Sequence, residues 1–218
     1  MIALLVMTDG RDDLLMQTVA SAAVMLQGPI THYVMHTDNG PDHRAELAIA
    51  YPTFDVIGGP RLGFGGAIDR AWRHVAHLPV RYVFHLEDDF TFNRTLDLRP
   101  MAHALYAHTY LAQLALRRQP WNDDEAAAGG IVEMWPDEYT DVEWEGEHWL
   151  EHRLFWTTNP SLLRVERCGF GWPVVKHSER FYTERVLASP ESRFAFWGAR
   201  DSGEWVRHIG AARAGSGY

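Results

Sequence analysis

The chain has 218 residues and a net charge of −9, and 46% of its residues are hydrophobic and 22% charged. These values are typical of one soluble globular domain with a full core, and no apolar run approaches the ~20 residues of a membrane span. The negative charge excludes a general attraction to nucleic acid, and the single cysteine, Cys168, excludes an internal disulfide. We therefore expect a cytoplasmic protein without stable membrane insertion.

The first half of the chain alternates between strand-like and helix-like segments. We predict strands at residues 2–7, 30–36, 54–57 and 81–87, with helices between them at 12–26, 41–50 and 65–77. Strands that alternate with helices form βαβ units, which build parallel sheets with right-handed crossovers. The predicted fold class is therefore α/β, with a Rossmann-type, mostly parallel sheet flanked by helices.

The second half has a less regular pattern. We predict helices at 101–118 and from Ser178, as the N-cap, to about 187, and short strands near 131–134, 154–157, 162–165 and 193–197. The acidic, Trp-rich segment 121–151 is either a mobile lid or an ordered excursion packed by its aromatic side chains. We expect a single domain over residues 1–210, with a disordered Ala-Gly-Ser-rich tail at 211–218.

Three consecutive acids, Glu87-Asp88-Asp89, end the apolar strand predicted at 81–87. Carboxylates are depleted in strands and adjacent acids repel one another, so this position requires a counter-charge. A divalent cation that carries a phosphate group can supply it, since Mg²⁺ and Mn²⁺ prefer oxygen ligands and are usually shared with substrate phosphates. The alternative is a solvated acidic turn after the strand.

Polar residues also follow the other predicted strands, at Thr8-Asp9-Gly10-Arg11, at 36–40 and at 58–61. Because ligands of parallel sheets bind beyond the carboxyl ends of the strands, these segments predict one site at one edge of the sheet. Common nucleotide motifs do not explain it. Gly63-Phe64-Gly65-Gly66 lacks the third glycine of a dinucleotide fingerprint, and the chain has no Gly-Lys-Ser/Thr element and no Gly-x-Ser-x-Gly elbow.

These segments together resemble the GT-A glycosyltransferases, especially the family 2-like enzymes. In that family a strand-end Asp-x-Asp or Glu-Asp-Asp motif holds a divalent metal on the diphosphate of a nucleotide sugar. The run His85-Leu86-Glu87-Asp88-Asp89-Phe90 is similar to the Glu-Asp-Asp variant. The resemblance implies that Asp89 binds Mn²⁺ or Mg²⁺ directly, while Glu87 and Asp88 face the ribose, the sugar or metal-bound waters.

The same resemblance implies a nucleotide pocket in the first half of the chain. Thr8, Asp9 and Arg11 lie where the family begins this pocket, and Asp38 lies where an acid commonly reads the base. Arg61 and Gly65 belong to a segment similar to the glycine-rich element that lines the donor diphosphate, where a helix N-terminus favours phosphate. Residues 1–98 would then form the nucleotide-sugar-binding half and residues 99–210 the acceptor-binding half of one GT-A-like domain.

Two later segments extend the resemblance. Asn159-Pro160-Ser161 is similar to an element that follows the variable loop, and His208-Ile209-Gly210 is similar to a segment whose histidine completes metal coordination. Asp89 and His208 are therefore the predicted metal ligands. The family's Trp-Gly-Gly-Glu-Asp acceptor motif has no clear counterpart. Glu179 is the predicted general base, with Glu184 as its rival and a charge at a helix N-terminus as the other interpretation of Glu179.

The function implied by the resemblance is metal-dependent hexosyl or pentosyl transfer from a nucleoside-diphosphate sugar to an acceptor hydroxyl. The acceptor stays open between a glycan, a protein, a lipid-linked sugar and a modified nucleobase, and both inversion and retention stay open. One alternative is a nucleotidyltransferase acting on a sugar phosphate, although residues 8–12 lack its usual glycine-rich, basic signature. The other is a nucleotide-sugar-binding protein that has lost catalysis.

Overall fold

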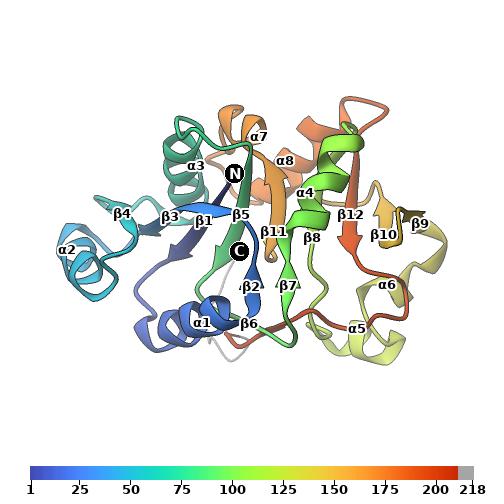
Figure 1. The fold of residues 1–218 in the computed structure, drawn as a ribbon, viewed down its shortest axis with the longest axis horizontal. Helices are drawn as coiled ribbons and strands as arrows, with labels where there is room; N and C mark the ends of the chain where they lie inside the picture. The colour runs from blue at the N-terminus through green and yellow to red at the C-terminus, as the bar shows by residue number, and fades with distance from the viewer. Residues whose placement is uncertain (211–218) are drawn as a thin grey trace.

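A nine-stranded β-sheet forms the centre of the computed structural model, which describes residues 1–210 (Figure 1). The strand order is β4-β3-β1-β5-β11-β8-β12-β10-β9. The first four strands in this order are parallel: β4 (Asp55–Gly58), β3 (Ile30–Thr37), β1 (Ile2–Thr8) and β5 (Tyr82–Glu87). The four strands predicted in the first half are therefore confirmed, and their carboxyl ends lie along one edge of the sheet.

The second half of the chain extends the same sheet with mixed strand directions. Strand β11 (Ser161–Arg164) lies antiparallel between β5 and β8 (Leu111–Ala115), and β12 (Arg193–Trp197) is parallel to β8. A hairpin of β9 (Thr140–Trp144) and β10 (Glu147–His152) follows, with β10 antiparallel to β12. Because β11 is antiparallel to both neighbours, β8 and β12 run in the direction of β5, and their carboxyl ends reach the same edge.

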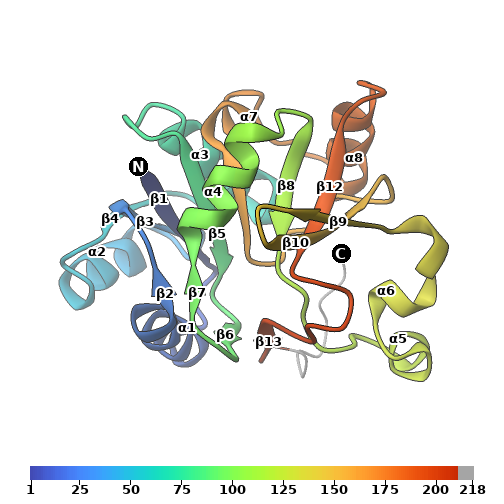
Figure 2. The same ribbon diagram turned by 45° about the vertical axis from the view of Figure 1, so that its right-hand side comes forward.

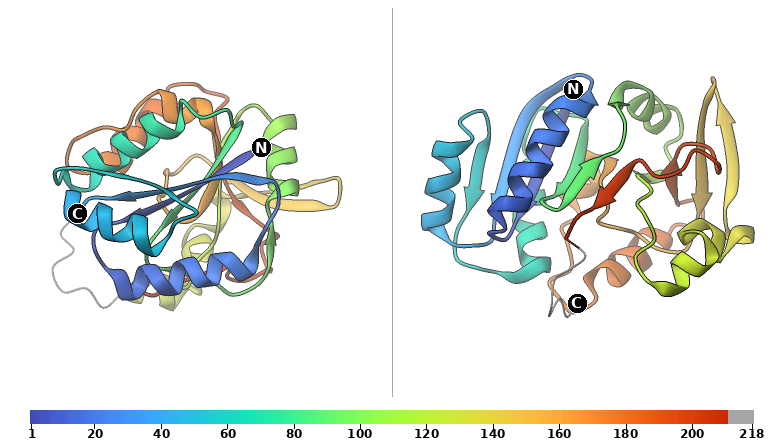
Figure 3. Two further views of the ribbon diagram at one scale, coloured as in Figure 1. Left: turned by 60° about the vertical axis from the view of Figure 1, so that its left-hand side comes forward. Right: turned by 90° about the horizontal axis from the view of Figure 1, so that it is seen from below.

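Helices cover both faces of this sheet (Figure 3). One face packs against α1 (Asp12–Met25), α2 (Pro41–Ala50) and α4 (Leu98–Ala107), and the other against α3 (Gly63–Val75), α7 (Val165–Gly169) and α8 (Ser178–Leu187). Strand β1 is buried along its whole length and contributes alternate side chains to the two cores. A parallel strand that helices cover on both faces typically has a continuous apolar sequence, and β1 has such a sequence.

Aromatic side chains fill the core beneath α3 and α8. The ring of Trp72 lies 5.0 Å from Trp172, 5.2 Å from Tyr182 and 5.8 Å from Trp156, measured between centroids. All four side chains are buried. Their edge-to-face contacts are the favoured geometry for aromatic pairs, so these tryptophans stabilise the fold.

Two short strand pairs lie beside the main sheet. Strand β6 (Phe90–Phe92) pairs antiparallel with β13 (Val206–His208), which places His208 opposite Phe90, and the two lie side by side in Figure 2 and in the view from below in Figure 3. Strand β2 (Leu26–Gln27) pairs with β7 (Leu96–Asp97). The first pair matters for function, because it returns the end of the described chain to the acid triplet.

The prediction of a helix over 101–118 is wrong beyond residue 107. Helix α4 ends at Ala107, and residues 111–115 form the central strand β8, in which every residue is buried. A short apolar run that is buried on all sides cannot be told from a helix by periodicity. The one polar side chain of β8, Gln113, donates to Thr157 O at 2.6 Å and to Ser161 Oγ at 2.9 Å.

Three smaller predictions are also wrong. Residues 131–134 form helix α6 (Ile131–Met134) after α5 (Asp123–Ala128), and 154–157 form no strand. Ser178 is the first residue of α8, because the cap position belongs to His177, whose φ of 56° is left-handed. Residues 140–151 are part of the main sheet, so the lid interpretation is restricted to residues 121–139.

The nine-stranded sheet takes strands from both predicted halves, 1–98 and 99–210, and the assignment of donor and acceptor to these halves stays a prediction. The predicted disordered tail at 211–218 lies outside the described residues. Within residues 1–210, the structure contains no helix with the length and apolar character needed to cross a membrane.

Candidate active site

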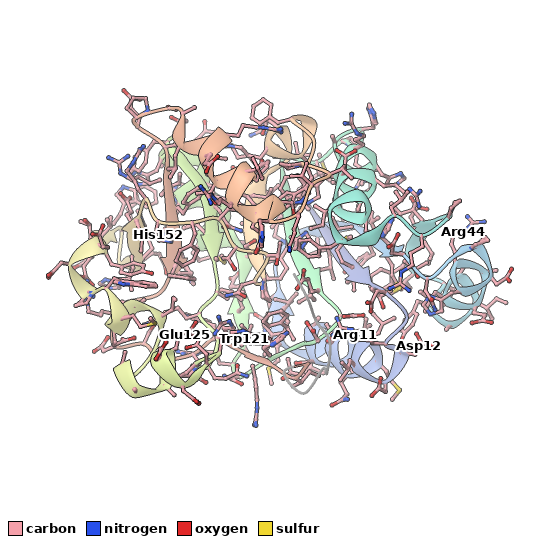
Figure 4. The ribbon with its side chains drawn as sticks, turned by 180° about the vertical axis from the view of Figure 1, so that it is seen from behind. Arg11, Asp12, Arg44, Trp121, Glu125 and His152 are labelled. Carbon is pink, nitrogen blue, oxygen red and sulfur yellow. The ribbon has the colours of Figure 1, made fainter. Side chains whose placement is uncertain are left out.

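Residues from several strand ends lie along the carboxyl edge of the sheet. Arg11 follows β1 and Trp121 follows β8, and Figure 4 shows both along this edge, whereas Arg44 and His152 lie away from it. The acid triplet ends β5 and continues into β6. The connections between strand and helix are short here, so the polar side chains have little freedom to diverge.

Arg11 supplies a counter-charge to the acid triplet. Its Nη1 donates to Asp89 Oδ2 at 2.5 Å, its Nη2 contacts Asp88 Oδ1, and its Nε donates to Asp9 Oδ1 at 3.1 Å. Burial opposes the charge of Arg11, but Asp88 and Asp89 outweigh it and raise the pKa of the guanidinium. Because Asp88 and Asp89 are buried, the interpretation as a solvated acidic turn is wrong.

Asp88 faces the end of β1. Thr8 Oγ1 donates to Asp88 Oδ2 at 2.6 Å, and Thr18 Oγ1 from α1 donates to the Asp88 carbonyl at 2.7 Å. Burial raises the pKa of Asp88 to about 6, although Thr8 and Arg11 both favour its ionised form. Asp88 therefore connects the acid triplet to Thr8 at the end of β1.

Asp89 lies against the last described segment of the chain. Asp89 Oδ2 is 3.0 Å from His208 Nε2, and Ile209 N donates to the Asp89 carbonyl at 2.8 Å. A Cβ atom on Gly210 would overlap Asp89 Oδ2, so only glycine permits this close return. Burial opposes the ionisation of Asp89, but the hydrogen bond and charge of His208, together with Arg11, outweigh it and lower the pKa of this carboxyl.

The position of His208 is held from both sides. Its ring lies between those of Phe90 and Trp121, at centroid distances of 4.7 Å and 4.6 Å. Gln119 Nε2 donates to the His208 carbonyl at 2.7 Å, and His208 N donates to Gln119 Oε1 at 2.8 Å. An imidazole that is clamped at its backbone and its ring has little freedom to turn away from Asp89.

Asp89 and His208 have the chemistry of metal ligands. Asp89 Oδ1 and His208 Nδ1 are buried and find no hydrogen-bond partner within residues 1–210. No cluster of three or more His, Cys, Asp or Glu side chains in this range could hold a metal by itself. One carboxylate and one imidazole nevertheless fit a cation that takes its remaining ligands from substrate phosphates and water, which is the usual mode for Mg²⁺ and Mn²⁺.

Two glutamates share one hydroxyl on the other side of the site. The side chain of Thr158 hydrogen-bonds both Glu87 and Glu179, and Thr158 N donates to Glu179 Oε1 at 2.9 Å. Burial raises the pKa of Glu179, and burial together with the charges of Asp89, Glu179 and Asp88 raises that of Glu87. A carboxyl with a raised pKa is suited to accept a proton.

These groups border one hollow of about 210 Å³, which we call the His208 hollow. It brings the predicted base, the predicted histidine ligand and the first acid of the triplet together. Its lining consists of Phe64, Glu87, Phe90, Arg118, Trp121, Thr157, Thr158, Asn159, Glu179 and His208. Glu184, the rival base, does not line this hollow, and its Oε1 accepts from Arg180 Nε at 3.0 Å on the exposed face of α8.

The remaining predicted residues lie around the start of α3. Asp38 accepts from Leu62 N at 2.8 Å and from Gly63 N at 2.7 Å, so this buried carboxylate holds the loop that precedes α3. Arg61 is exposed in that loop. A Cβ atom on Gly65 would lie 2.9 Å from the Pro173 carbonyl, so the glycine permits contact with the loop before α8. Base reading by Asp38 and phosphate binding by Arg61 and Gly65 stay predictions.

Sequence reasoning missed Arg118, Gln119 and Trp121, which follow β8. Arg118 Nη1 donates to the buried Glu125 at 2.8 Å and its guanidinium lies 5.4 Å from the Trp121 ring centroid. The sequence pattern predicts a helix over residues 101–118, and this prediction hides the end of strand β8. A strand prediction at 111–115 would have added a fifth polar strand end to the site.

No protein-family model matches the chain, and no curated protein matches it by sequence. Solved structures match it across 93–95% of its length. They include S. aureus TarS 1-349 in complex with UDP (13% identity, TM-score 0.62) and GalNAc-T7 with UDP, GalNAc and Mn²⁺ (10% identity, TM-score 0.64). A third is the mannosyltransferase PcManGT from Pyrobaculum calidifontis with GDP-Man and Mn²⁺ (13% identity, TM-score 0.54).

The chain spans 59%, 43% and 58% of these three proteins, in the same order. The likeness therefore concerns the shared α/β unit, with its mostly parallel sheet and its flanking helices. At identities of 10–13%, it establishes the architecture alone. The chain has the fold of the GT-A glycosyltransferases.

Proposed function

We propose that this protein is a metal-dependent glycosyltransferase that uses a nucleoside-diphosphate sugar. The observation that carries the proposal is the pairing of Asp89 with His208 at 3.0 Å, together with the hollow that His208 lines with Glu179, a carboxyl whose pKa burial raises. Three structures with the same fold contain UDP or GDP-Man, and two of them contain Mn²⁺. The geometry and the fold support the same chemistry independently.

The donor would lie across the carboxyl ends of β1 and β5. Thr8, Asp9, Arg11 and Asp38 would surround the nucleoside, and the helix N-terminus that contains Gly65, with Arg61, would face the diphosphate. Glu87 and Asp88 would face the ribose and the sugar. The buried acids would repel a diphosphate that carries no metal ion. A cation held at Asp89 and His208 would therefore compensate the charge of the diphosphate.

The two sides of the His208 hollow would have different roles in the reaction. The bound cation would neutralise the charge that builds up on the leaving nucleoside diphosphate. An imidazole ligand beside the carboxylate favours Mn²⁺ over Mg²⁺, because imidazole is the softer donor. Glu179 would remove the proton of the acceptor hydroxyl, and attack from this side, opposite the leaving group, would invert the anomeric configuration.

The test is a screen of UDP-sugars and GDP-sugars with Mn²⁺, with Mg²⁺ and with chelator, in which release of the nucleoside diphosphate is measured. Slow transfer to water identifies the donor before the acceptor is known. Asp89→Asn should lower metal-dependent release roughly a hundredfold or more, since it removes the charged ligand. Asp137→Asn, at an exposed acid away from the site, is the matched control.

Each alternative gives a different result in the same screen. Formation of a nucleotide sugar from a sugar phosphate would identify a nucleotidyltransferase. Donor binding without any turnover would identify a binding protein that has lost catalysis. Full metal-dependent activity in Asp89→Asn would remove the assignment of the metal site.

A further inference from the structure

We infer that an acceptor site for an uncharged, sugar-like molecule lies on the far side of Glu179. The inference rests on the proposed function and adds the chemical class of the acceptor. A second hollow, of about 520 Å³, lies between α8 and the loop 154–157, and we call it the Phe155 hollow. Glu179 and Thr157 line both this hollow and the His208 hollow. The predicted base therefore faces two spaces, one on the donor side and one that can hold an acceptor.

The residues that the two hollows share are held in place by hydrogen bonds. Thr183 Oγ1 donates to the Glu179 carbonyl at 2.8 Å, and Trp156 N donates to Thr183 Oγ1 at 2.8 Å. Together with the bond from Thr158 N to the Glu179 carboxylate, these contacts fasten α8 to the loop 154–158. A base held in this way keeps its position when a ligand binds on either side.

Charge in the Phe155 hollow argues against an anionic acceptor. Among the described residues that line it, Arg180 is the one cation, and its Nε is bound to Glu184 Oε1 at 3.0 Å. The two other ionisable groups of the lining are the acids Glu179 and Glu184. A phosphate in this space would meet two carboxylates and one guanidinium that is already paired with one of them, so the charge of the lining disfavours an anion.

Apolar side chains in the same hollow favour a neutral ring. Leu154, Phe155 and Leu187 are partly buried and leave hydrocarbon surface in the hollow. The Phe155 ring is fixed by His152 and Phe196, at centroid distances of 5.1 Å and 6.3 Å. A sugar ring has an apolar C–H face that packs on such surfaces and hydroxyl groups at its rim that can reach Glu179. The volume is within the range of pockets that hold small molecules.

A larger hollow, of about 700 Å³, has the opposite character. It is lined by Arg167, Arg185 and the exposed Phe170, near the amino ends of β8 and β12. Glu179 does not line it. A substitution in this hollow therefore serves as a control, because it removes an aromatic side chain from a hollow that does not contain the predicted base.

The experiment measures transfer from the donor found above to phenyl β-glycosides and to the corresponding sugar 6-phosphates. We expect kcat/KM to be at least about tenfold higher for the neutral glycosides, because the phosphates lack a cationic partner. Phe155→Ala should raise KM for the glycoside about tenfold and leave KM for the donor within twofold, while Phe170→Ala should change neither. Glu184→Gln removes the charge that pairs with Arg180 on the exposed face of α8. The ratio of kcat/KM for neutral glycosides to that for sugar phosphates should therefore become smaller.

A parallel binding measurement keeps this inference separate from the proposed function. Saturation-transfer NMR of phenyl β-glycosides should show binding to the wild type and to Phe170→Ala, and weaker binding to Phe155→Ala. If no donor is hydrolysed, the proposed function fails, and the NMR result still decides whether the hollow binds neutral sugars. Hydrolysis of the donor without binding or glycosylation of any neutral glycoside, or equal use of the phosphates, would overturn the inference.

Discussion

At the scale of single residues, one hydroxyl group connects the two glutamates of the site. The Thr158 side chain hydrogen-bonds Glu87 and Glu179, and a hydroxyl can donate only one proton. One of the two carboxyls must therefore accept while the other is the donor or bonds weakly. Burial raises the pKa of both glutamates and the Thr158 hydroxyl lowers it, and a carboxyl with a raised pKa is suited to act as a general base.

Glu179 should determine the acidic limb of the pH profile. A base acts when ionised, so activity should rise with pH through the pKa of Glu179, which burial raises above the ordinary value of 4.5. Glu179→Gln should lower kcat by about 10²–10⁴ and remove this limb. The measurement is kcat against pH with saturating metal and donor, at pH values where a circular-dichroism control shows that the variant stays folded.

Thr158 provides the matched pair of variants for this measurement. Its hydrogen bonds favour the ionised form of Glu179, so Thr158→Val should shift the acidic limb to higher pH, and Thr158→Ser should restore it. A limb that stays in place in Thr158→Val, or that persists in Glu179→Gln, would show that another group titrates.

At the scale of elements, the site depends on two segments that lie far apart in sequence. Strand β13 pairs with β6 and returns His208 to Asp89, and the loop after β8 supplies Gln119 to hold the His208 backbone. The return is tight because the backbone of residues 209–210 passes directly over the Asp89 carboxylate. The predicted metal ligands, Asp89 and His208, are therefore placed by strand pairing rather than by their own loops.

Gly210→Ala should disturb the proposed metal site while most of the fold remains. The added methyl group would overlap Asp89 Oδ2, so either Asp89 or the 208–210 segment must shift. We expect Mn²⁺ affinity to fall about 10- to 100-fold, as for loss of a supporting contact at a metal site. Electron paramagnetic resonance of Mn²⁺ in the presence of the nucleoside diphosphate measures this affinity.

Gly169→Ala is the control for Gly210→Ala, because a Cβ atom there meets nothing within 4 Å. It should bind Mn²⁺ as the wild type does. Equal affinities in the two variants would contradict the close return of the chain to Asp89.

At the scale of the whole molecule, the core on one face of the sheet contains neutral histidines. Burial lowers the pKa of His36 and His85 to about 4 and that of His152 to about 3. Below pH 6.5 these histidines bind protons in the unfolded chain but stay neutral in the folded chain. The free energy of unfolding should therefore fall as pH drops from about 6.5 towards these lowered values.

His152→Phe should flatten this pH dependence. The His152 ring stacks on Phe196 at a centroid distance of 5.3 Å, so phenylalanine can replace it in the aromatic core. Between pH 6 and 4 the unfolding free energy of the variant should fall less steeply than that of the wild type, by about 1 kcal/mol per pH unit. Urea titrations across this range give the slope. His77→Gln, at an exposed position, should leave it unchanged, and parallel curves for His152→Phe and wild type would refute the assignment.

The sequence by itself determined the first half of the sheet and the chemistry of its edge. Alternating strands and helices with short connections predicted β1, β3, β4 and β5 within about two residues, because each element and its crossover are encoded locally. The acid triplet at the end of β5 marked the site for the same reason. Charge at the end of an apolar strand is a local conflict, and such conflicts concentrate at functional sites.

Only the tertiary structure decided which residues complete that edge. Strand β8 is buried on all sides, so its apolar run shows no period. The pairing of β11 between β5 and β8 joins residues 46 to 82 positions apart, from Ser161 with Ala115 to Arg164 with Tyr82. The contacts of Arg11 with the triplet, of Asp38 with the loop at 62–63 and of His208 with Asp89 depend on other long-range pairs, namely β1 with β5, β3 with β4 and β6 with β13. Local sequence patterns describe the elements, whereas long-range strand order and side-chain packing determine which of their ends meet.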